Sequence, residues 1–244
     1  DAQLGIGLYD GILLALFFYN LILWLSLRDS SHFWYMCHLA GFGLVLFCLN
    51  GLAFEYLWPN SPWLANHAIP LAMCLAQIAM HQFARTFLEL KSRWPLADKV
   101  ALAFIVFLGV LAIASLWVPY RTSVRIGTLL VFLTVPMIVL QAFHAIRHGY
   151  RPARLFLAAW TMLPLGTAIY ATVSFGLLPK NLFTEYGIQF GSALEMILLS
   201  FALAYRYASL RSENESVVRE ANEQLERNVS RRTAELSAAL EQLA

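Results

Sequence analysis

One acidic residue of this sequence stands in the middle of a long apolar segment. Glu195 lies about ten residues, or roughly 15 Å of helix, after the start of segment 185–207, which places it near the centre of a membrane. A carboxyl group at that depth is stable only when it is protonated or paired. The position therefore indicates either a hydrogen bond to a neighbouring helix or a protonation or ligand switch, and both interpretations stay open.

Further polar side chains lie near one end of the first three apolar segments, namely Asp10, Glu55, Asn66 and His67. Together with Glu195, we take Asp10, Glu55 and His67 as the candidate ligand or signal residues, since they could line a cavity that opens outward. Polar residues are also ordinary at a membrane surface, which is the alternative. No metal-binding or catalytic constellation stands out, so we expect no metal, no cofactor and no enzymatic activity in this chain.

The helices that position these residues are expected to be solvated by lipid. Only 13% of the residues are charged and the mean hydropathy is +0.62, whereas soluble domains carry about 25% charged residues. A membrane helix needs about 20 mostly apolar residues. Seven windows meet this length: 4–27, 33–57, 64–88, 100–118, 124–146, 153–176 and 185–207. We therefore expect an all-α membrane protein built as a seven-transmembrane helix bundle.

Basic residues predict the orientation of this bundle, because Lys and Arg near the ends of spans are retained in the cytoplasm. With the amino terminus outside, only Arg121, Arg125 and Lys180 lie at the outer ends. The inner ends hold ten basic residues: Arg28, Arg85, Lys91, Arg93, Lys99, Arg147, Arg151, Arg154, Arg206 and Arg211. We expect a periplasmic amino terminus, a cytoplasmic carboxyl terminus, and Tyr35 in the aromatic belt of the inner membrane surface.

Small residues indicate where helices pack closely. Gly187, Gly191 and Glu195 are spaced by four residues and therefore share one helix face, where small side chains let another helix approach. Gly7 and Gly11 form a second pair with the same spacing. We expect both pairs to lie at helix contacts.

The sequence after Tyr207 loses its apolar character but keeps helix-forming residues without Pro or Gly. A seam of apolar or small residues continues at spacings of three and four, with a four-residue insertion that interrupts the heptads: Val218, Ala221, Leu225, Val229, Thr233, Leu236, Leu240 and Leu243. We expect the last membrane helix to continue into a cytoplasmic coiled coil that forms a parallel homodimer; a solvated single helix is the alternative. The predicted domains are 1–207 for the membrane bundle and 208–244 for the coiled coil.

Residues 222–236, NEQLERNVSRRTAEL, resemble the signalling helices that join bacterial membrane sensors to histidine kinase, PAS or diguanylate cyclase domains. The membrane part is similar to the seven-transmembrane receptors with diverse intracellular signalling modules (7TMR-DISM). The similarity rests on Gly7-x-x-x-Gly11, Tyr19-Asn20-Leu21, Asn50-Gly51, Phe83-Ala84-Arg85-Thr86-Phe87-Leu88 and Gly191-x-x-x-Glu195-x-x-Leu198-Leu199-Ser200.

This resemblance implies a receptor of the bacterial inner membrane that relays an extracytoplasmic or intramembrane signal to a cytoplasmic output domain. The output would be a diguanylate cyclase or the histidine kinase of a two-component system, and an extracytoplasmic sensor domain would precede the first helix. Because the chain begins without Met and ends inside the heptad-like pattern, we expect it to be part of a longer protein. The expected partners are membrane lipid, a second copy of the chain and these linked domains, with no nucleic acid.

The main alternative is a proton-coupled small-molecule transporter, in which Glu195 and His81 would belong to a proton path. Transporters commonly contain two repeat-related halves with helices broken at matching places, and the sequence shows no such repeat. A light-driven rhodopsin would need a Lys near the middle of the last span, and the nearest one, Lys180, lies outside it. The receptor interpretation is therefore favoured.

Overall fold

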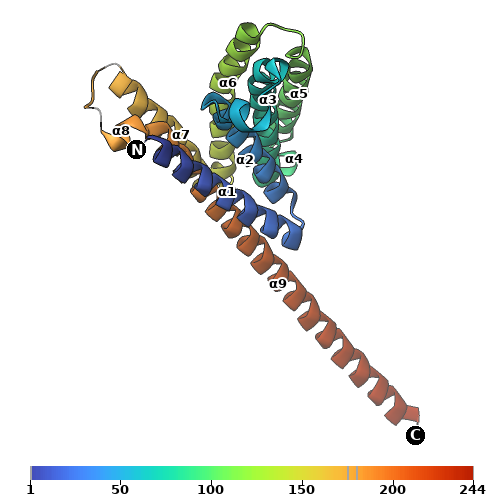
Figure 1. Cartoon of the computed structure of the whole chain (residues 1–244). Coiled ribbons are helices and arrows are strands. Elements are labelled where there is room, and N and C mark those ends of the chain that lie inside the picture. Colours follow the sequence, from blue (N-terminus) through green and yellow to red (C-terminus); the bar gives the residue numbers. More distant parts are fainter. Residues whose placement is uncertain (1, 175, 180, 244) are drawn as a thin grey trace. The chain divides into compact units, whose positions relative to one another are not determined.

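The computed structural model describes residues 2–174, 176–179 and 181–243, and in this part the chain forms helices and no strand. The elements are α1 (Ala2–Leu27), α2 (Ser30–Leu49), a π-helical turn η1 (Ala53–Leu57), α3 (Pro62–Phe87), α4 (Leu90–Arg93), α5 (Pro95–Ala114), α6 (Tyr120–Arg147), α7 (Pro152–Ser174), α8 (Leu182–Glu185) and α9 (Gly187–Leu243) (Figure 1). The all-helical fold predicted from the sequence is confirmed.

Six of these helices are long and apolar enough to cross a membrane: α1, α2, α3, α5, α6 and α9. The helix α7, which corresponds to the predicted span 153–176, does not belong to this set, so the total of seven spans stays a prediction. The chain divides into two compact units, Asp1–Leu203 and Ala204–Ala244. The first unit holds the helix bundle, and the second holds the remainder of α9.

The second apolar segment forms a shorter helix than the window 33–57 predicts. Asp29 caps the start of α2 by accepting a hydrogen bond from the backbone N–H of Ser31 at 3.2 Å. The helix ends at Leu49 because Gly51 adopts a left-handed conformation, with φ of 80°, which an L side chain rarely adopts. The apolar residues that follow form η1 instead of a continuation of α2.

The helix α3 lies at the centre of the first unit, where it contacts α2, α5 and α6. Its buried side is rich in alanine, which lets neighbouring backbones come close. A Cβ atom at Gly41 of α2 would lie only 3.0 Å from the Cα atom of Ala76. Small residues on both helices therefore place α2 directly against α3.

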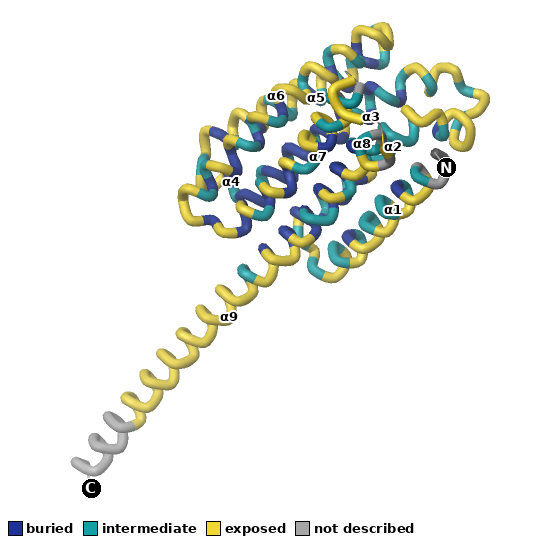
Figure 2. Tube along the Cα trace, turned by 90° about the vertical axis from the view of Figure 1, so that its left-hand side faces the viewer, coloured by how far each residue is buried: buried dark blue, intermediate teal, exposed yellow. Residues whose placement is uncertain are grey.

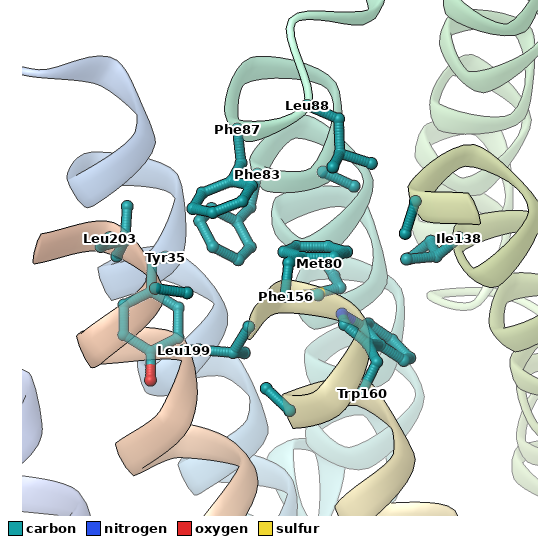
Figure 3. Packing of buried hydrophobic residues seen from close by; sticks show 14 of the residues in the cluster. Tyr35, Met80, Phe83, Phe87, Leu88, Ile138, Phe156, Trp160, Leu199 and Leu203 are labelled. Atoms are coloured by element: carbon teal, nitrogen blue, oxygen red, sulfur yellow. The ribbon is translucent and has the colours of Figure 1, made fainter. Parts of the chain in front are cut away.

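A cluster of aromatic side chains fills the core where α2, α3 and α7 meet (Figure 3). Phe83 and Phe87 of α3 are fully buried, and the ring of Phe156 from α7 stacks on Phe87 at 5.0 Å. Tyr35 of α2 lies 5.2 Å from Phe83. Leu199 of α9 completes this cluster, so the start of α9 packs into the same core.

The bundle is held together at one end by polar contacts between α3, α5 and the turn before α7. Arg85 binds both carboxylate oxygens of Asp98, at 2.7 and 3.1 Å. The hydroxyl group of Tyr150 donates to the carbonyl oxygen of Phe87 at 2.9 Å, and the guanidinium of Arg93 lies 4.3 Å from the centre of the Tyr150 ring. In Figure 1 the α5–α6 connection lies at the opposite end of the bundle.

Many residues of α5 and α6 are exposed, and the tube in Figure 2 colours them yellow. Large apolar residues are among them. They include Val106, Phe107, Val110, Ile113, Leu129 and Phe132. Such a surface is unfavourable in water and favourable in hydrocarbon. The exposure pattern of these helices is that of a bundle surrounded by lipid.

Candidate functional site

A cavity of about 160 Å³ lies inside the first unit and is lined by α2, α3, α6, α7 and α9. Most of its lining is apolar or aromatic. The lining residues are His38, Phe42, Val45, Met73, Ala76, Gln77, Met80, Val131, Thr134, Val135, Trp160, Leu163 and Glu195. Two of them, Met80 of α3 and Trp160 of α7, are labelled in Figure 3.

Glu195 is the only Asp, Glu, Lys or Arg in this lining. The residue is 4% exposed, and its carboxyl group makes no hydrogen bond to any residue that the structure describes. The interhelical hydrogen bond that the sequence offered as one interpretation is thus not formed within the described part of the chain. Charge on a buried carboxyl group without a partner is costly, so the site favours either the neutral acid or the arrival of a counter-charge.

His38 adds a hydrogen-bond acceptor to the lining. Its Nδ1 atom lies 3.2 Å from the carbonyl oxygen of Ala76. Because a carbonyl oxygen can only accept, Nδ1 carries the proton, and Nε2 of the neutral ring is left as an acceptor. The imidazole also stacks on Phe42 at 6.0 Å, which fixes its plane.

A chain of polar side chains links α3 to α6 on another side of the cavity. Thr134 donates to the amide oxygen of Gln77 at 3.1 Å, and the amide nitrogen of Gln77 donates to the carbonyl oxygen of Gly127 at 3.3 Å. Nε2 of His81 lies 3.2 Å from the hydroxyl oxygen of Thr134. The polar groups of Gln77 and Thr134 are therefore occupied by one another and by the backbone, unlike the carboxyl group of Glu195.

The face of α9 next to Glu195 is hydrogen-bonded to α1 and α2. Ser192 donates to the hydroxyl oxygen of Tyr9 at 3.0 Å. Tyr35 donates to the carbonyl oxygen of Met196 at 2.6 Å, and the amide of Asn20 donates to the hydroxyl oxygen of Ser200 at 3.2 Å. All six residues in these three hydrogen bonds are buried.

Sequence reasoning missed most of this polar face. Tyr35 was expected in an aromatic belt at the membrane surface, and that expectation is wrong, because the side chain is fully buried. The signal available in the sequence was the spacing of Ser192, Met196 and Ser200, which puts them on one face of α9. Their partners on α1 and α2 lie more than 160 positions away in the sequence.

The expected glycine contacts differ between the two pairs. Gly187 and Gly191 lie against Gly166 of α7, and a Cβ atom at Gly191 would come within 2.6 Å of the carbonyl oxygen of Met162. Gly7 and Gly11 have no atom of the described residues within 4 Å of a Cβ position. The close crossing of α7 and α9 sets the position of Glu195, which lies one turn beyond Gly191.

The structure separates the other candidate residues from Glu195. Asp10 lines a groove between α1 and α2 with apolar side chains such as Leu13 and Phe47. Glu55 is exposed on η1. His67 stacks on Trp63 at 4.5 Å, and its Nδ1 atom lies 2.7 Å from the Trp63 carbonyl oxygen. Asp10, Glu55 and His67 do not line the Glu195 cavity.

Two histidines that the sequence reasoning passed over have the spacing of metal ligands. His144 and His148 lie four residues apart on α6 and in the turn after it, and their rings are 4.0 Å apart. The ring of Trp94 stacks on His144 at 4.0 Å. Among the described residues no group of three or more His, Cys, Asp or Glu could hold a metal ion. The pair is thus part of an aromatic stack at the end of α6.

The second unit displays the predicted seam on an exposed helix. Val218, Leu225 and Val229 are each more than half exposed, at 59%, 61% and 56%. The side chains of Leu236, Leu240 and Leu243 lie outside the described residues. Ion pairs occupy another side of the helix, with Arg219 bound to Glu223 at 3.2 Å. These three apolar side chains are therefore open to solvent in the single chain.

A family model described as 7TM diverse intracellular signalling matches residues 2–206. The match thus covers the bundle and the membrane part of α9, and it includes every residue of the cavity lining. Neither a curated protein nor a solved structure shows a match to this chain.

Proposed function

Because the chain belongs to the 7TM diverse intracellular signalling family, we propose that it is a bacterial inner-membrane receptor that signals through α9. In this proposal an extracytoplasmic or intramembrane signal changes the packing of α9 in the bundle. The change is passed along the same helix to a cytoplasmic output domain, which is a diguanylate cyclase or a histidine kinase. The chain of residues 1–244 itself transmits the signal and catalyses no reaction.

The observation that carries this proposal is the position of α9. Within the first unit this helix lines the cavity through Glu195, packs on α7 through Gly191 and accepts a hydrogen bond from Tyr35 at the carbonyl oxygen of Met196. After Gly191 the sequence has no Gly or Pro up to its end, so nothing in the local sequence interrupts the helix. A change at the buried contacts therefore has a covalent route to the tail.

The proposed topology places the amino terminus in the periplasm and counts α7 among seven spans, with α9 as the last. The mostly apolar sequence of α7 and its burial against α9 support this role. Several of the basic residues assigned to the cytoplasm, among them Arg85 and Arg93, lie at the end of the bundle where α3, α4 and α5 meet. Lys and Arg near the ends of spans are retained on the cytoplasmic side of a bacterial membrane, which supports this orientation.

We further propose that the tail forms a parallel homodimer. Val218, Leu225 and Val229 expose an apolar seam that a second copy would cover. With about 100° of rotation per residue, Arg219, Glu223 and Arg227 lie on the half of the helix away from this seam. Their ion pairs, at 3.2 and 3.8 Å, leave the seam free of charge. This separation of apolar and charged faces is typical of a coiled-coil helix.

Insertions that rotate the tail about the axis of α9 relative to the bundle test the proposal. One to seven residues are inserted between Arg211 and Val218 of the full-length receptor, and the activity of the output domain is measured in membranes. Each inserted residue turns the seam by about 100°, and seven residues turn it by about 700°, within roughly 20° of two full turns. We expect altered output after two or five inserted residues and nearly native output after seven.

Equal output from all insertions, with normal membrane insertion, would show that the tail is a passive tether and would contradict signalling through the helix. Proton-driven uptake of a solute by vesicles that contain only residues 1–244 would instead favour the transporter.

A further inference from the structure

The cavity beside Glu195 contains a carboxyl group for which the described lining residues supply no counter-charge. Glu195 is 4% exposed, and the lining includes no Lys and no Arg. Its carboxyl group has no hydrogen-bond partner among the described residues. A bound molecule that carries a positive charge would provide the missing partner, and hydrogen bonds between charged groups are the strong ones in proteins.

The remaining lining is suited to the rest of such a molecule. Aromatic rings of Phe42 and Trp160 border the cavity, and aromatic faces attract cations. Nε2 of His38 is an acceptor for a second N–H group, because Nδ1 donates to Ala76. The other lining side chains are mostly apolar and would contact an uncharged body.

The volume of the cavity indicates the size of a molecule that it can enclose. An engineered protein cavity of about 150 Å³ binds benzene, so a cavity of about 160 Å³ accommodates a molecule with about six to eight non-hydrogen atoms. A molecule with several charges does not fit, because the lining offers only one carboxyl group.

We propose that this cavity is a binding site for a small organic monoamine, whose ammonium group pairs with the carboxylate of Glu195 and whose apolar body contacts the rings of Phe42 and Trp160. The idea that such an amine is the signal rests on the receptor function proposed above. Binding of the amine depends on residues of the first unit alone, and it can be measured without an output domain.

Binding is measured with benzylamine, benzyl alcohol and toluene, which have nearly the same shape and differ in one polar group. The protein of residues 1–244 is placed in zwitterionic lipid nanodiscs, and empty nanodiscs correct for partition into lipid. The variants are Glu195→Gln, which removes the charge but keeps the shape, and Glu55→Gln, which makes the same change at an exposed position on η1.

We expect benzylamine to bind to the native protein and to Glu55→Gln at least ten times more tightly than benzyl alcohol or toluene. In Glu195→Gln the affinity for benzylamine should fall roughly ten- to hundredfold, as expected for a lost hydrogen bond between charged groups, while the affinity for toluene is unchanged. Val135→Phe, which narrows the cavity and keeps Glu195, should weaken all three probes. Val135→Phe keeps the test valid if Glu195→Gln does not fold.

Equal affinities for the three probes, or undiminished benzylamine binding in Glu195→Gln, would overturn the proposal. Unchanged benzylamine binding in Val135→Phe would also overturn it, because the amine would then lie elsewhere. The receptor function is tested separately. If the amine binds but the output does not depend on the number of inserted residues, the binding site is supported and its role in signalling is contradicted. If the output depends on the number of inserted residues but no amine binds, signalling through α9 is supported and the amine site is contradicted.

Discussion

Replacing Gly191 by alanine is expected to force α7 and α9 apart. A Cβ atom at this position would lie 2.6 Å from the carbonyl oxygen of Met162 and 3.1 Å from the Cα atom of Gly166. Ordinary contacts begin at 3.4 Å, so one helix must move by roughly 0.8 Å, the difference between 3.4 and 2.6. Both opposing atoms belong to the backbone and cannot rotate away as a side chain would. Overpacking of this kind costs about 1–3 kcal/mol.

Gly109→Ala is the matched control for this change. Gly109 also lies within a helix, α5, but no described atom lies within 4 Å of its Cβ position. Both variants gain about 1 kcal/mol from the higher helix propensity of alanine. The difference between their free energies of unfolding therefore isolates the cost of overpacking, about 1–3 kcal/mol.

The free energies are compared by thermal unfolding and by titration with a denaturing detergent, on protein in the same lipid. We expect Gly109→Ala to be as stable as the native protein or slightly more stable, and Gly191→Ala to be clearly less stable than Gly109→Ala. Equal stability of the two variants would refute the close crossing of α7 and α9, and with it the position of Glu195 at the cavity.

Two further predictions concern the dimer and the polar face of α9. In a protein without its native cysteines, a cysteine at Leu225 should form a disulfide with its copy in membranes, whereas a cysteine at Glu223 should not; equal cross-linking would contradict the seam. Tyr35→Phe should lower the free energy of unfolding by about 1 kcal/mol, because the carbonyl oxygen of Met196 loses a buried donor. Tyr56→Phe, at a 67% exposed position, should change it little, and the same loss in both variants would show that the buried bond is not responsible.

The positions of the helices could be predicted because each membrane helix is a long apolar run between turn residues. The boundaries were less predictable. Gly51 ends α2 inside a run of apolar residues, and only its left-handed backbone shows that the segment is divided. Hydropathy does not detect such a break, because Phe54 and Tyr56 after it are as apolar as the helix before it.

Glu195 could be identified from the sequence because a single carboxylate in an apolar segment is rare. Its surroundings could not, since the cavity is built from four other helices that lie far away in the sequence. His38 and Trp160 look like ordinary membrane aromatics until packing places them together. The sequence grouped Glu195 with Asp10, Glu55 and His67 by their chemistry, whereas the fold distributes these residues over separate surfaces.

A ligand beside Glu195 can change the tail only if it binds two arrangements of α9 with different affinity. Glu195 lies between two contacts of different kinds. The contact at Gly191 is backbone against backbone and has no side chain that can give way. The contact at Met196 is a hydrogen bond from the side chain of Tyr35 on α2, at 2.6 Å. This bond can break without leaving the Met196 carbonyl oxygen unpaired, because Ser200 of α9 itself also donates to it at 3.0 Å. Filling the cavity is therefore expected to tilt α9 about its crossing with α7, with the larger displacement on the side that leads into the tail.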